Sequence, residues 1–572
     1  MLKVCIIDGY IDEPTCLGVP PYISPYPRYI AGAVYDYDKK ANICYFTIDQ
    51  IRTDKKIINI LEKSDIIVVI AGMSVPGRYL SGYPASPNEI ISIISNCPKP
   101  LKILTGPAAR YGFGMFGGHK TRDLFIIKKE FDIIAKGDGE IIIYKLLKNN
   151  LSIDNIKTDL CRRDSHEIVN YAIQGAKIVT RHPYYPYYII TEIETYRGCP
   201  RTIVGGCSFC SEPSKGLPDF RPIKDILSEI KALYDNGIRH FRLGNQPCIF
   251  SYMSKDAGEK ERPRPNPEAL EQLFKGIRLV APDLKTLHID NVNPGVIAEY
   301  AYESEKIAKT IIKYHTSGDI AAMGMESADP VVIEKNNLKA SPEEVKKAIR
   351  VLYKVGAKRG YNGMPELLPG LNFVFGLEGE TKKTFELNYI FLKQILDEGL
   401  KIRRINLRQV IPIPGTKMYD VGIKLVNKHK ADFKRFKKQV KESIERPMLQ
   451  RLLPVGTIIR DVFCEKQDGK TMFARQLGSY PLLIGLPGVS IINCFIDVKI
   501  VDYGYRSITG VPHPIDINTA SRETLETIPG IGKKRAIRIL ANRPFNDNKQ
   551  FLEAFDDPII GQKTLIFIEK NK

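Results

Sequence analysis

The sequence predicts a multidomain α/β protein, on three observations: its length, its alternating strands and helices, and one tight cluster of cysteines. A chain of 572 residues is longer than one hydrophobic core usually supports, so about three or four domains are expected. Short β-branched runs at residues 2–7 and 65–70 are typical of buried parallel strands. The cysteine cluster, at residues 199–210, lies between two α/β regions.

The first α/β region is predicted to be an open, Rossmann-like sheet. A third strand is expected at residues 102–105, ending at Gly106 and Pro107. Ser86 is placed to cap a helix, with Pro87 at the first helical position. Strands that alternate with helices in this way form a mostly parallel sheet with helices on its faces.

Changes in composition divide the rest of the chain. A segment rich in Tyr and Pro precedes the cysteine cluster and is expected to be a linker, after which strands and helices alternate again. Short strands with glycine turns follow, and then a final run of helices. The expected parts are a Rossmann-like domain, a linker, a larger α/β domain, a basic helical linker, a small β domain and a helical domain, at residues 1–160, 161–188, 189–420, 421–453, 454–511 and 512–572.

The chain is strongly basic, with 84 Lys and Arg against 65 Asp and Glu and a net charge of +19. Such an excess favours polyanionic partners, because binding releases counterions from phosphates. The expected helix at 421–453 is amphipathic, since Phe433, Phe436, Val440 and Ile444 share one face and lysines surround it. A basic protein without a polyanionic partner is the alternative interpretation.

Composition also excludes several classes of protein. Met1 leads directly into an apolar strand, without the basic leader or cleavage signature of a secreted protein. No uncharged run approaches the roughly 20 residues that span a bilayer. We therefore expect a cytoplasmic protein with no membrane partner. In such a protein clustered cysteines indicate metal ligands or catalytic groups, and a disulfide framework is not expected from the eleven present.

The chemistry is expected in the cysteine cluster, with Cys199, Cys207 and Cys210 as metal ligands. Three thiolates can hold three irons of a [4Fe-4S] cluster and leave the fourth iron without a protein ligand. A substrate-binding metal needs such an open position. The alternative is a zinc site whose fourth ligand is Cys248 or His240.

The motif resembles the cluster loop of the radical S-adenosylmethionine (SAM) superfamily, in which the last two cysteines flank one residue and an aromatic. Phe209 holds the aromatic position, which the resemblance places near the adenine of SAM. The gap between Cys199 and Cys207 is longer than in the family's usual pattern. A strict pattern search would therefore miss this chain.

Further motifs follow in the family's order, and the resemblance implies a partial (β/α) barrel. Residues 242–246 stand where the family grips the SAM amino group, and residues 324–327 resemble its Gly-x-Glu-Ser motif. Residues 375–381 match the Gly-Leu-Pro-Gly-Glu-Thr turn with Glu378 in place of proline, and residues 411–416 match the closing Pro-Gly-Thr element. The implied SAM-binding residues are Phe209, Gly244, Asn245, Gln246, Glu326, Ser327 and Gly376.

Two points stay open within this resemblance. Glu326 has an alternative role as a helix N-cap or surface carboxylate. No residue is identified as catalytic, because in this family SAM and the cluster carry the difficult chemistry while the protein positions them.

The resemblance implies reductive cleavage of SAM. An electron from the reduced cluster, supplied by a donor such as ferredoxin or flavodoxin, breaks a sulfur–carbon bond of SAM. The 5′-deoxyadenosyl radical that results abstracts a hydrogen atom from the substrate.

The N-terminal domain resembles the cobalamin-binding-type domain that precedes many radical SAM enzymes. The likeness depends on Pro20 and Pro21, the strand at 65–70, the turn at Gly106 and the Gly-Asp-Gly-Glu sequence at 137–140. The loop that supplies a lower cobalt ligand, Asp-x-His-x-x-Gly, is absent. Related methylthiotransferases hold a second cluster through three N-terminal cysteines, a context that this chain's early cysteines do not match. Bound cobalamin and a second iron–sulfur cluster both remain open.

The C-terminal residues resemble a helix-hairpin-helix motif. Gly530 and Gly532 form a tight turn at a helix start, so unpaired backbone N–H groups can face a phosphate. Lys533, Lys534 and Arg535 add positive charge. Such a module binds the nucleic-acid backbone without reading its sequence. A small protein-binding or dimerisation domain is the alternative.

The small β domain at 454–511 resembles the TRAM β-barrel, with which methylthiotransferases hold transfer RNA. Together with the charge and the hairpin, it favours a radical SAM enzyme that methylates or methylthiolates nucleic acid, RNA more than DNA. A radical SAM enzyme for a small molecule, lipid or peptide is the second hypothesis. A nucleic-acid-binding protein without turnover is the third.

Overall fold

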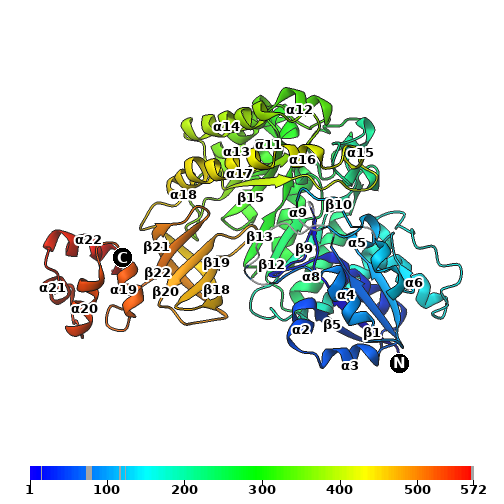
Figure 1. Ribbon diagram of the computed structural model, residues 1–572, viewed down its shortest axis with the longest axis horizontal. Coiled ribbons are helices and arrows are strands. Elements are labelled where there is room, and N and C mark those ends of the chain that lie inside the picture. Colours follow the sequence, from blue (N-terminus) through cyan, green and yellow to red (C-terminus); the bar gives the residue numbers. More distant parts are fainter. Residues whose placement is uncertain (14–15, 73–79, 81, 115–116, 123, 569–572) are drawn as a thin grey trace.

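The computed structural model confirms a multidomain α/β architecture (Figure 1). One hydrophobic core cluster extends from Val4 in the N-terminal sheet, through the central barrel, to Ile508 in the small β domain. The domains therefore pack on one another through apolar contacts. In the described part of the chain, no helix combines the length and the hydropathy needed to cross a lipid bilayer. The structure describes residues 1–13, 16–72, 80, 82–114, 117–122 and 124–568.

The N-terminal domain is a five-stranded parallel sheet in the order β5-β1-β6-β7-β8. The apolar runs seen in the sequence form β1 and β6, which pair in register from Val4 with Ile66 onward. Ser86 caps α4 as predicted, accepting a hydrogen bond from the backbone of Glu89. The elements are β1 (Lys3–Asp8), β5 (Asn42–Thr47), β6 (Ile66–Ile70), β7 (Leu101–Thr105), β8 (Ile133–Ile134), α1 (Pro25–Tyr37), α2 (Ile48–Thr53), α3 (Ile57–Glu62), α4 (Pro87–Ile94), α5 (Pro107–Tyr111) and α6 (Gly139–Lys148).

Part of the segment expected to be a linker is helical instead. α7 (Val169–Gln174) continues into a 3-10 helix, Gly175–Arg181, and both pack against α1. A Cβ at Gly32 would lie 1.9 Å from the carbonyl oxygen of Tyr171, and a Cβ at Gly175 would lie 1.8 Å from that of Arg28. These two glycines therefore bring the backbones into direct contact, which the Tyr and Pro content of the segment does not reveal.

The central domain is a partial (β/α) barrel built from two four-stranded sheets, β13-β12-β9-β4 and β14-β15-β16-β17. Only Asp290 separates β13 from β14, so the two sheets form one wall. β4 comes from the N-terminal domain and pairs with β9, Tyr22 lying opposite Ile190. The strands are β4 (Tyr22–Ile23), β9 (Ile190–Glu194), β12 (His240–Gly244), β13 (Thr286–Ile289), β14 (Asn291–Val292), β15 (Asp319–Glu326), β16 (Leu367–Phe375) and β17 (Arg404–Gln409).

Helices cover the outside of this barrel (Figure 1). Their buried residues share one face, as in α13, where Val345, Ala348, Ile349 and Leu352 are buried. The helices are α8 (Ile223–Asp235), α9 (Pro267–Val280), α10 (Pro294–Glu299), α11 (Ala301–Tyr314), α12 (Pro330–Lys335), α13 (Pro342–Gly356) and α14 (Lys382–Asp397).

The basic helix and the small β domain follow the barrel. The expected single helix is divided into several shorter ones, in which Phe436, Val440 and Ile444 are buried as predicted and Phe433 is partly buried. The five strands of the small domain close into a barrel in the order β18-β19-β20-β22-β21. The elements are α15 (Lys417–Val421), α16 (Lys424–Lys428), α17 (Lys430–Val440), the π-helix Lys441–Glu445, α18 (Arg446–Leu452), β18 (Ile458–Asp468), β19 (Thr471–Gln476), β20 (Leu483–Pro487), β21 (Cys494–Tyr503) and β22 (Ser507–Pro512).

The loop between β19 and β20 reaches into the central barrel. The backbone N–H of Gly478 donates to the hydroxyl of Tyr188 over 3.0 Å, and that of Ser479 donates to Nδ1 of His288 over 2.8 Å. The C-terminal helices lie at the far end of the molecule from the N-terminal domain (Figure 1). They are α19 (Arg522–Thr527), α20 (Lys533–Ala541), α21 (Asn548–Glu553) and α22 (Pro558–Ile568).

Candidate active site

The cysteine loop lies at the carboxyl end of the first barrel strand, β9. β10 (Tyr196–Arg197) pairs with β11 (Asp219–Phe220) and closes the base of the loop. Gly198 has a φ of +86°, and a Cβ there would lie 2.3 Å from the carbonyl oxygen of Leu217. Only glycine therefore lets the chain turn into the loop at this point.

Nitrogen donors point at two of the three sulfurs. Nη1 of Arg201 donates to Sγ of Cys207 over 3.0 Å, and the backbone N–H of Glu212 donates to Sγ of Cys210 over 3.4 Å. Donors of this kind stabilise thiolates and cluster sulfurs. Burial raises the pKa of Cys199 to about 12, so this thiol keeps its proton at neutral pH when no metal is bound. Because a metal binds the thiolate, metal binding is expected to release that proton.

The three thiols of the cysteine loop lie near one another. Burial raises the pKa of both Cys199 and Cys210, and the negative charge of Cys207 adds to both shifts, so the three thiols are neighbours. Within the described ranges, however, no three Cys, His, Asp or Glu side chains lie close enough to hold one metal ion. The hydrogen bonds donated to the sulfurs of Cys207 and Cys210 are of the kind that cluster sulfur ligands accept.

The two residues considered as a fourth zinc ligand are engaged elsewhere. Sγ of Cys248 accepts a hydrogen bond from the backbone N–H of Asn293 over 3.1 Å. His240 begins β12, at the opposite end of the barrel, and its Nδ1 lies 2.8 Å from Oγ1 of Thr286.

Glu326 and Lys339 meet beside the cysteine loop. Glu326 ends β15 with a φ of +52°, a strained value for this residue type, and its carboxylate lies 3.6 Å from Nζ of Lys339. A Cβ at Gly324 would lie 2.1 Å from Oε1 of Glu326, so the glycine makes room for the pair. Burial raises the pKa of Cys207, and the charges of Lys339 and Glu326 also act on it. Glu326 is buried and Asp329 caps α12, which excludes the alternative roles for Glu326.

The three residues of the motif at the end of β12, Gly244, Asn245 and Gln246, have different structural roles. A Cβ at Gly244 would lie 1.8 Å from Oε1 of Glu192, so glycine is needed for that carboxylate to fit. Asn245 has a φ of +53°, and its amide donates to Oε2 of Glu194 over 2.8 Å. Gln246 is completely buried and its amide donates to a backbone carbonyl, which supports the turn, while its Oε1 has no hydrogen-bond partner among the described residues.

Phe209 and Gly376 border one apolar patch. Phe209 is half-buried against a cluster that includes Val410 and Val426. A Cβ at Gly376 would lie 2.3 Å from Val426 and 3.3 Å from Val410, and its φ is +87°. These two predicted SAM-binding residues therefore lie against the same apolar cluster. Ser327 differs, because it is buried and its hydroxyl accepts a hydrogen bond from the backbone two residues further on.

The predicted phosphate-binding turn lies at the start of α20. Gly532 is the N-cap and has no side-chain cap, and a Cβ there would meet no atom within 4 Å. Lys533 and Lys534 are exposed and make no ion pair within the part of the chain that the structure describes. Arg535 differs from the prediction, because it pairs with Asp556 at 2.6 Å and is less available to a phosphate.

Sequence reasoning missed Arg201 and Lys339. Arg201 lies inside the unusually long cysteine gap, and Lys339 follows α12, where no motif marks it. An arginine between the first two cysteines is the only signal that could have indicated a donor to the sulfurs.

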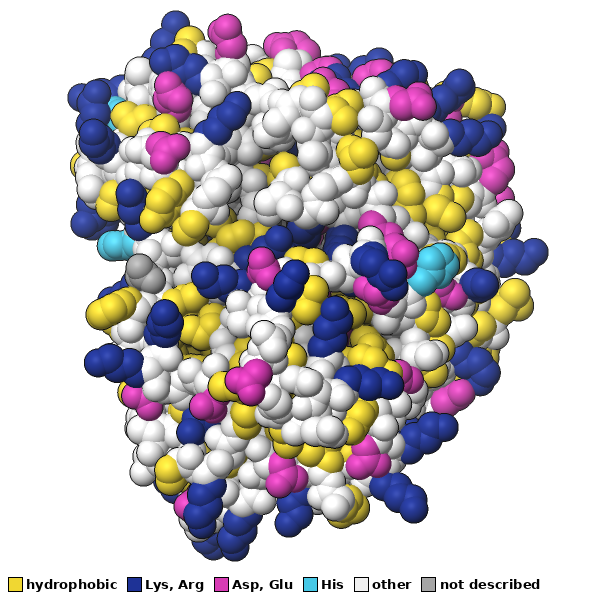
Figure 2. Space-filling view, turned by 90° about the vertical axis from the view of Figure 1, so that its right-hand side faces the viewer, with side chains coloured by type: hydrophobic (Ala, Val, Ile, Leu, Met, Phe, Trp, Pro, Cys, Tyr) yellow, Lys and Arg dark blue, Asp and Glu magenta, His cyan; other side chains and the backbone are white. Residues whose placement is uncertain are grey.

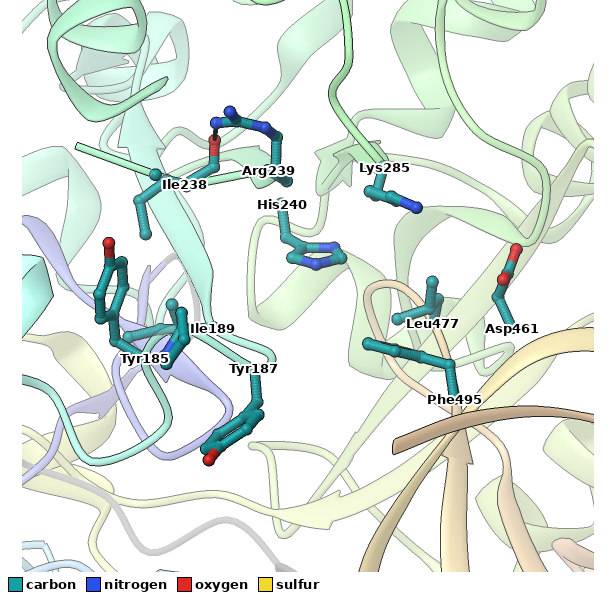
Figure 3. Close-up of a pocket in the computed structure, with 12 residues that line it drawn as sticks. Tyr185, Tyr187, Ile189, Ile238, Arg239, His240, Lys285, Asp461, Leu477 and Phe495 are labelled. Carbon is teal, nitrogen blue, oxygen red and sulfur yellow. Dashed lines mark hydrogen bonds between the residues drawn. The ribbon is translucent and has the colours of Figure 1, made fainter. Parts of the chain in front are cut away.

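A separate cavity of about 250 Å³ lies at the amino ends of the barrel strands, against the small β domain. Figure 3 shows the ring of Phe495 and the side chain of Leu477 on one side of it, with His240 and Lys285 across from them. Phe495 and Tyr187 are both exposed. This cavity lies at the opposite end of the barrel from the cysteine loop.

Comparison with known proteins agrees with this geometry. The family described as the radical SAM superfamily matches residues 193–389, which hold the cysteine loop and the strand ends at Glu326 and Gly376. The chain belongs to the radical SAM superfamily. It is an enzyme of this kind, and a [4Fe-4S] cluster and SAM are the cofactors of the superfamily. A helix-hairpin-helix motif matches residues 512–565.

Three similar proteins illustrate the range of this radical SAM enzyme's relatives. Uncharacterized protein MJ0274 of Methanocaldococcus jannaschii is 52% identical over 513 residues, which is 89% of this chain and 93% of that protein. Ribosomal protein uS12 methylthiotransferase RimO of Actinobacillus succinogenes is 25% identical over 320 residues, covering 55% of this chain and 64% of RimO. The structure of the radical SAM methyltransferase TsrM from Kitasatospora setae has a TM-score of 0.47 at 14% identity, covering 73% of this chain and 75% of TsrM.

Proposed function

We propose that this radical SAM enzyme methylates or methylthiolates nucleic acid, RNA more than DNA. The observation that carries the proposal is the meeting of the three-cysteine loop with Glu326 and Lys339 at one end of the barrel, in a chain that also carries a helix-hairpin-helix motif. The relatedness to a methylthiotransferase supports transfer of a methyl or methylthio group.

In this proposal Cys199, Cys207 and Cys210 hold the [4Fe-4S] cluster through three irons. When bound, the cluster and SAM supply a 5′-deoxyadenosyl radical that abstracts hydrogen from the substrate. Arg201 stabilises the sulfur of Cys207, because it donates a hydrogen bond to it. Ferredoxin or flavodoxin is the proposed electron donor, in a cytoplasmic setting that suits eleven free cysteines.

The residues around Glu326 are proposed to bind SAM. The carboxylate of Glu326 suits the amino group of the methionine part, and the ammonium of Lys339 suits its carboxylate. Phe209 and Gly376 border the apolar patch where the adenine would lie. Gly244 and Asn245 shape the rim, while Gln246 and Ser327 hold the strand-end turns in place.

The C-terminal domains are proposed to bind the nucleic acid. The unpaired first-turn N–H groups of α20 and the exposed Lys533 and Lys534 suit a backbone phosphate. The cavity beside Phe495 supports the same partner, since exposed aromatic rings next to Lys285 and Arg239 suit unstacked bases. Lysines along the exposed face of α17 extend the basic surface.

Cobalamin and a second cluster remain proposals of lower priority. Cys5 and Cys44 lie opposite each other on neighbouring strands, while Cys16 belongs to a different hydrophobic cluster from Cys5. The N-terminal cysteines therefore do not converge in the way that a second three-cysteine site requires.

The test combines two measurements. Protein reconstituted anaerobically with iron and sulfide, then reduced with dithionite, is expected to form 5′-deoxyadenosine from SAM. Mass spectrometry of nucleosides is expected to show one modified nucleoside missing from a strain that lacks the gene, and restored when the enzyme acts on that strain's RNA. An unchanged nucleoside profile would contradict the nucleic-acid substrate. A changed mass of a ribosomal protein would instead favour a peptide substrate, as the name of the uS12 methylthiotransferase suggests for that relative.

A further inference from the structure

Two arginines of the last barrel strand face the lumen without a carboxylate partner. On β17, Ile405 and Leu407 pack into the core, so Arg404 and Arg408 at the alternate positions point the other way. Neither guanidinium forms an ion pair or donates a hydrogen bond to any described residue. Nε of Arg408 is buried and has no hydrogen-bond partner there.

Buried arginines nearby are paired with carboxylates, whereas Arg404 and Arg408 are partly buried and form no such pair with a described residue. Arg242, on β12, forms ion pairs with Glu192 and Asp290 in the same lumen. Arg162 pairs with Glu194. Because an unpaired buried cation is costly, the fold supplies carboxylates at these positions. Among the described residues no carboxylate forms an ion pair with Arg404 or Arg408, although the charges of Asp12 and Glu445 act on them at longer range, so an anion can still bind to the pair.

The surroundings hold Arg404 in place without neutralising it. Its guanidinium carbon lies 4.0 Å from the ring centroid of Tyr480, whose hydroxyl donates to Oδ1 of Asp290 over 2.7 Å. Burial, together with the positive charge of Arg408, lowers the pKa of Arg404 to about 10. A negative group in the lumen would offset both the loss of hydration and the repulsion between the two guanidinium groups.

Asp12 and Glu445 are the acids near this pair, and Asp12 is a weak counterion. It comes from β2 (Asp12–Glu13), an N-terminal strand whose carboxylate feels the charges of Arg404 and Arg408. Burial raises the pKa of Asp12 to about 7 in spite of these arginines. At neutral pH its charge is therefore incomplete. Figure 2 shows a hollow that crosses the middle of one face of the molecule, with Lys and Arg side chains at its base.

We propose that Arg404 and Arg408 bind a phosphate group of the substrate nucleotide inside the barrel lumen. This inference rests on the proposed function and names the part of the substrate that enters the site. Two guanidinium groups suit phosphate because each presents paired donors to its oxygens. β17 pairs with β16, which leads into Gly376, so the phosphate site and the adenine patch lie on neighbouring strands.

The experiment measures binding of inorganic pyrophosphate to reconstituted full-length protein by calorimetry, with citrate as a carboxylate probe. The double variant Arg404→Gln/Arg408→Gln is expected to bind pyrophosphate about tenfold more weakly or worse. The control Lys275→Gln/Lys306→Gln, which removes the same charge from exposed helix positions, is expected to stay within about twofold of the native protein. Arg404→Lys/Arg408→Lys keeps the charge and is expected to bind more tightly than the glutamine variant.

Four outcomes distinguish a failure of the anion site from a failure of the proposed function. Pyrophosphate binding that is unchanged in both the glutamine and the lysine double variants would overturn the site. Tighter binding of citrate than of pyrophosphate would overturn the assignment to phosphate. Pyrophosphate binding through this pair, without any RNA modification, would refute the proposed function and leave the anion site standing. RNA modification with an unchanged KM in the glutamine variant would refute the anion site alone.

Discussion

Nη1 of Arg201 lies 3.0 Å from Sγ of Cys207 and donates a hydrogen bond to it. The same guanidinium also donates to the backbone carbonyl of Asn337 over 2.7 Å. Arg201 therefore ties one proposed cluster ligand to the segment that leads into Lys339. A change at this arginine should alter the cluster more than the fold around it.

The variant Arg201→Gln is expected to lower the midpoint potential of the cluster by up to about 60 mV, because a cationic donor to sulfur favours the reduced, more negative state. A redox titration followed by electron paramagnetic resonance (EPR) checks this. The control is Arg163→Gln, an exposed arginine paired with Glu167 on the surface. Equal potentials in the two variants, at equal iron content, would contradict the role given to Arg201.

The variant Glu326→Gln is expected to raise the Kd for SAM about tenfold, because a charged hydrogen bond to the amino group would be lost. Equilibrium dialysis with labelled SAM measures this, and iron content should be unchanged. Glu334→Gln, at an exposed site on α12, is the matched control. If both variants bind SAM as the native protein does, Glu326 is not a SAM ligand.

The variants Lys533→Gln and Lys534→Gln are each expected to lower the slope of log K against log salt for RNA binding by about 0.7 to 0.9. Each removes one phosphate contact at the start of α20. Filter binding across a salt series provides the slopes. Native slopes in both variants would show that the hairpin does not contact the nucleic-acid backbone.

The variant Arg535→Gln tests whether this arginine stabilises the helix-hairpin-helix motif or contacts the nucleic acid. Since Arg535 pairs with Asp556 and donates to the carbonyl of Gly530, its loss is expected to lower the melting temperature of the C-terminal helices. The salt slope should change less than in the lysine variants. A larger fall in the salt slope for Arg535→Gln than for Lys534→Gln would show that Arg535 contacts the nucleic-acid backbone.

The variant Glu229→Gln is expected to lower the free energy of unfolding by about 3–5 kcal/mol at neutral pH, because it leaves Arg28 and Arg221 buried beside a neutral group. Burial alone would raise the pKa of Glu229, but the two arginines outweigh it and lower the pKa. The stabilisation is thus present above the unfolded pKa, near pH 4.5, and is lost as pH falls through the lower folded value.

Denaturant unfolding at neutral pH and at low pH tests this sign. The difference between native protein and Glu229→Gln should shrink as pH falls below about 4.5. A difference that grows on acidification would mean that Glu229 is protonated in the folded protein.

Local patterns in the sequence predicted much of the fold. The apolar runs at β1 and β6, the Ser86 cap and the strand ends at Gly244 and Glu326 all depend on short-range signals that the structure bears out. Packing between distant segments was not predictable in this way. The contact of α7 with α1 depends on Gly32 and Gly175, which lie far apart in the chain.

The same limit applies to the site. The cysteine loop and its flanking motifs have recognisable spacings, so their residues could be identified in advance. Lys339 and Arg404 are single basic residues in a chain rich in them, and only the fold shows which of them face the cysteines or the lumen. For Gln246 the motif position was informative, but burial shows that its side chain faces inward.

The most direct test of the central claim is the EPR spectrum of reconstituted, dithionite-reduced protein recorded with and without SAM. Three cysteine ligands and one open iron predict a [4Fe-4S] signal whose g values shift when SAM is added, and loss of that signal when Cys199, Cys207 and Cys210 are replaced by alanine. A spectrum that does not respond to SAM, or protein that takes up zinc and shows no cluster signal, would contradict the account.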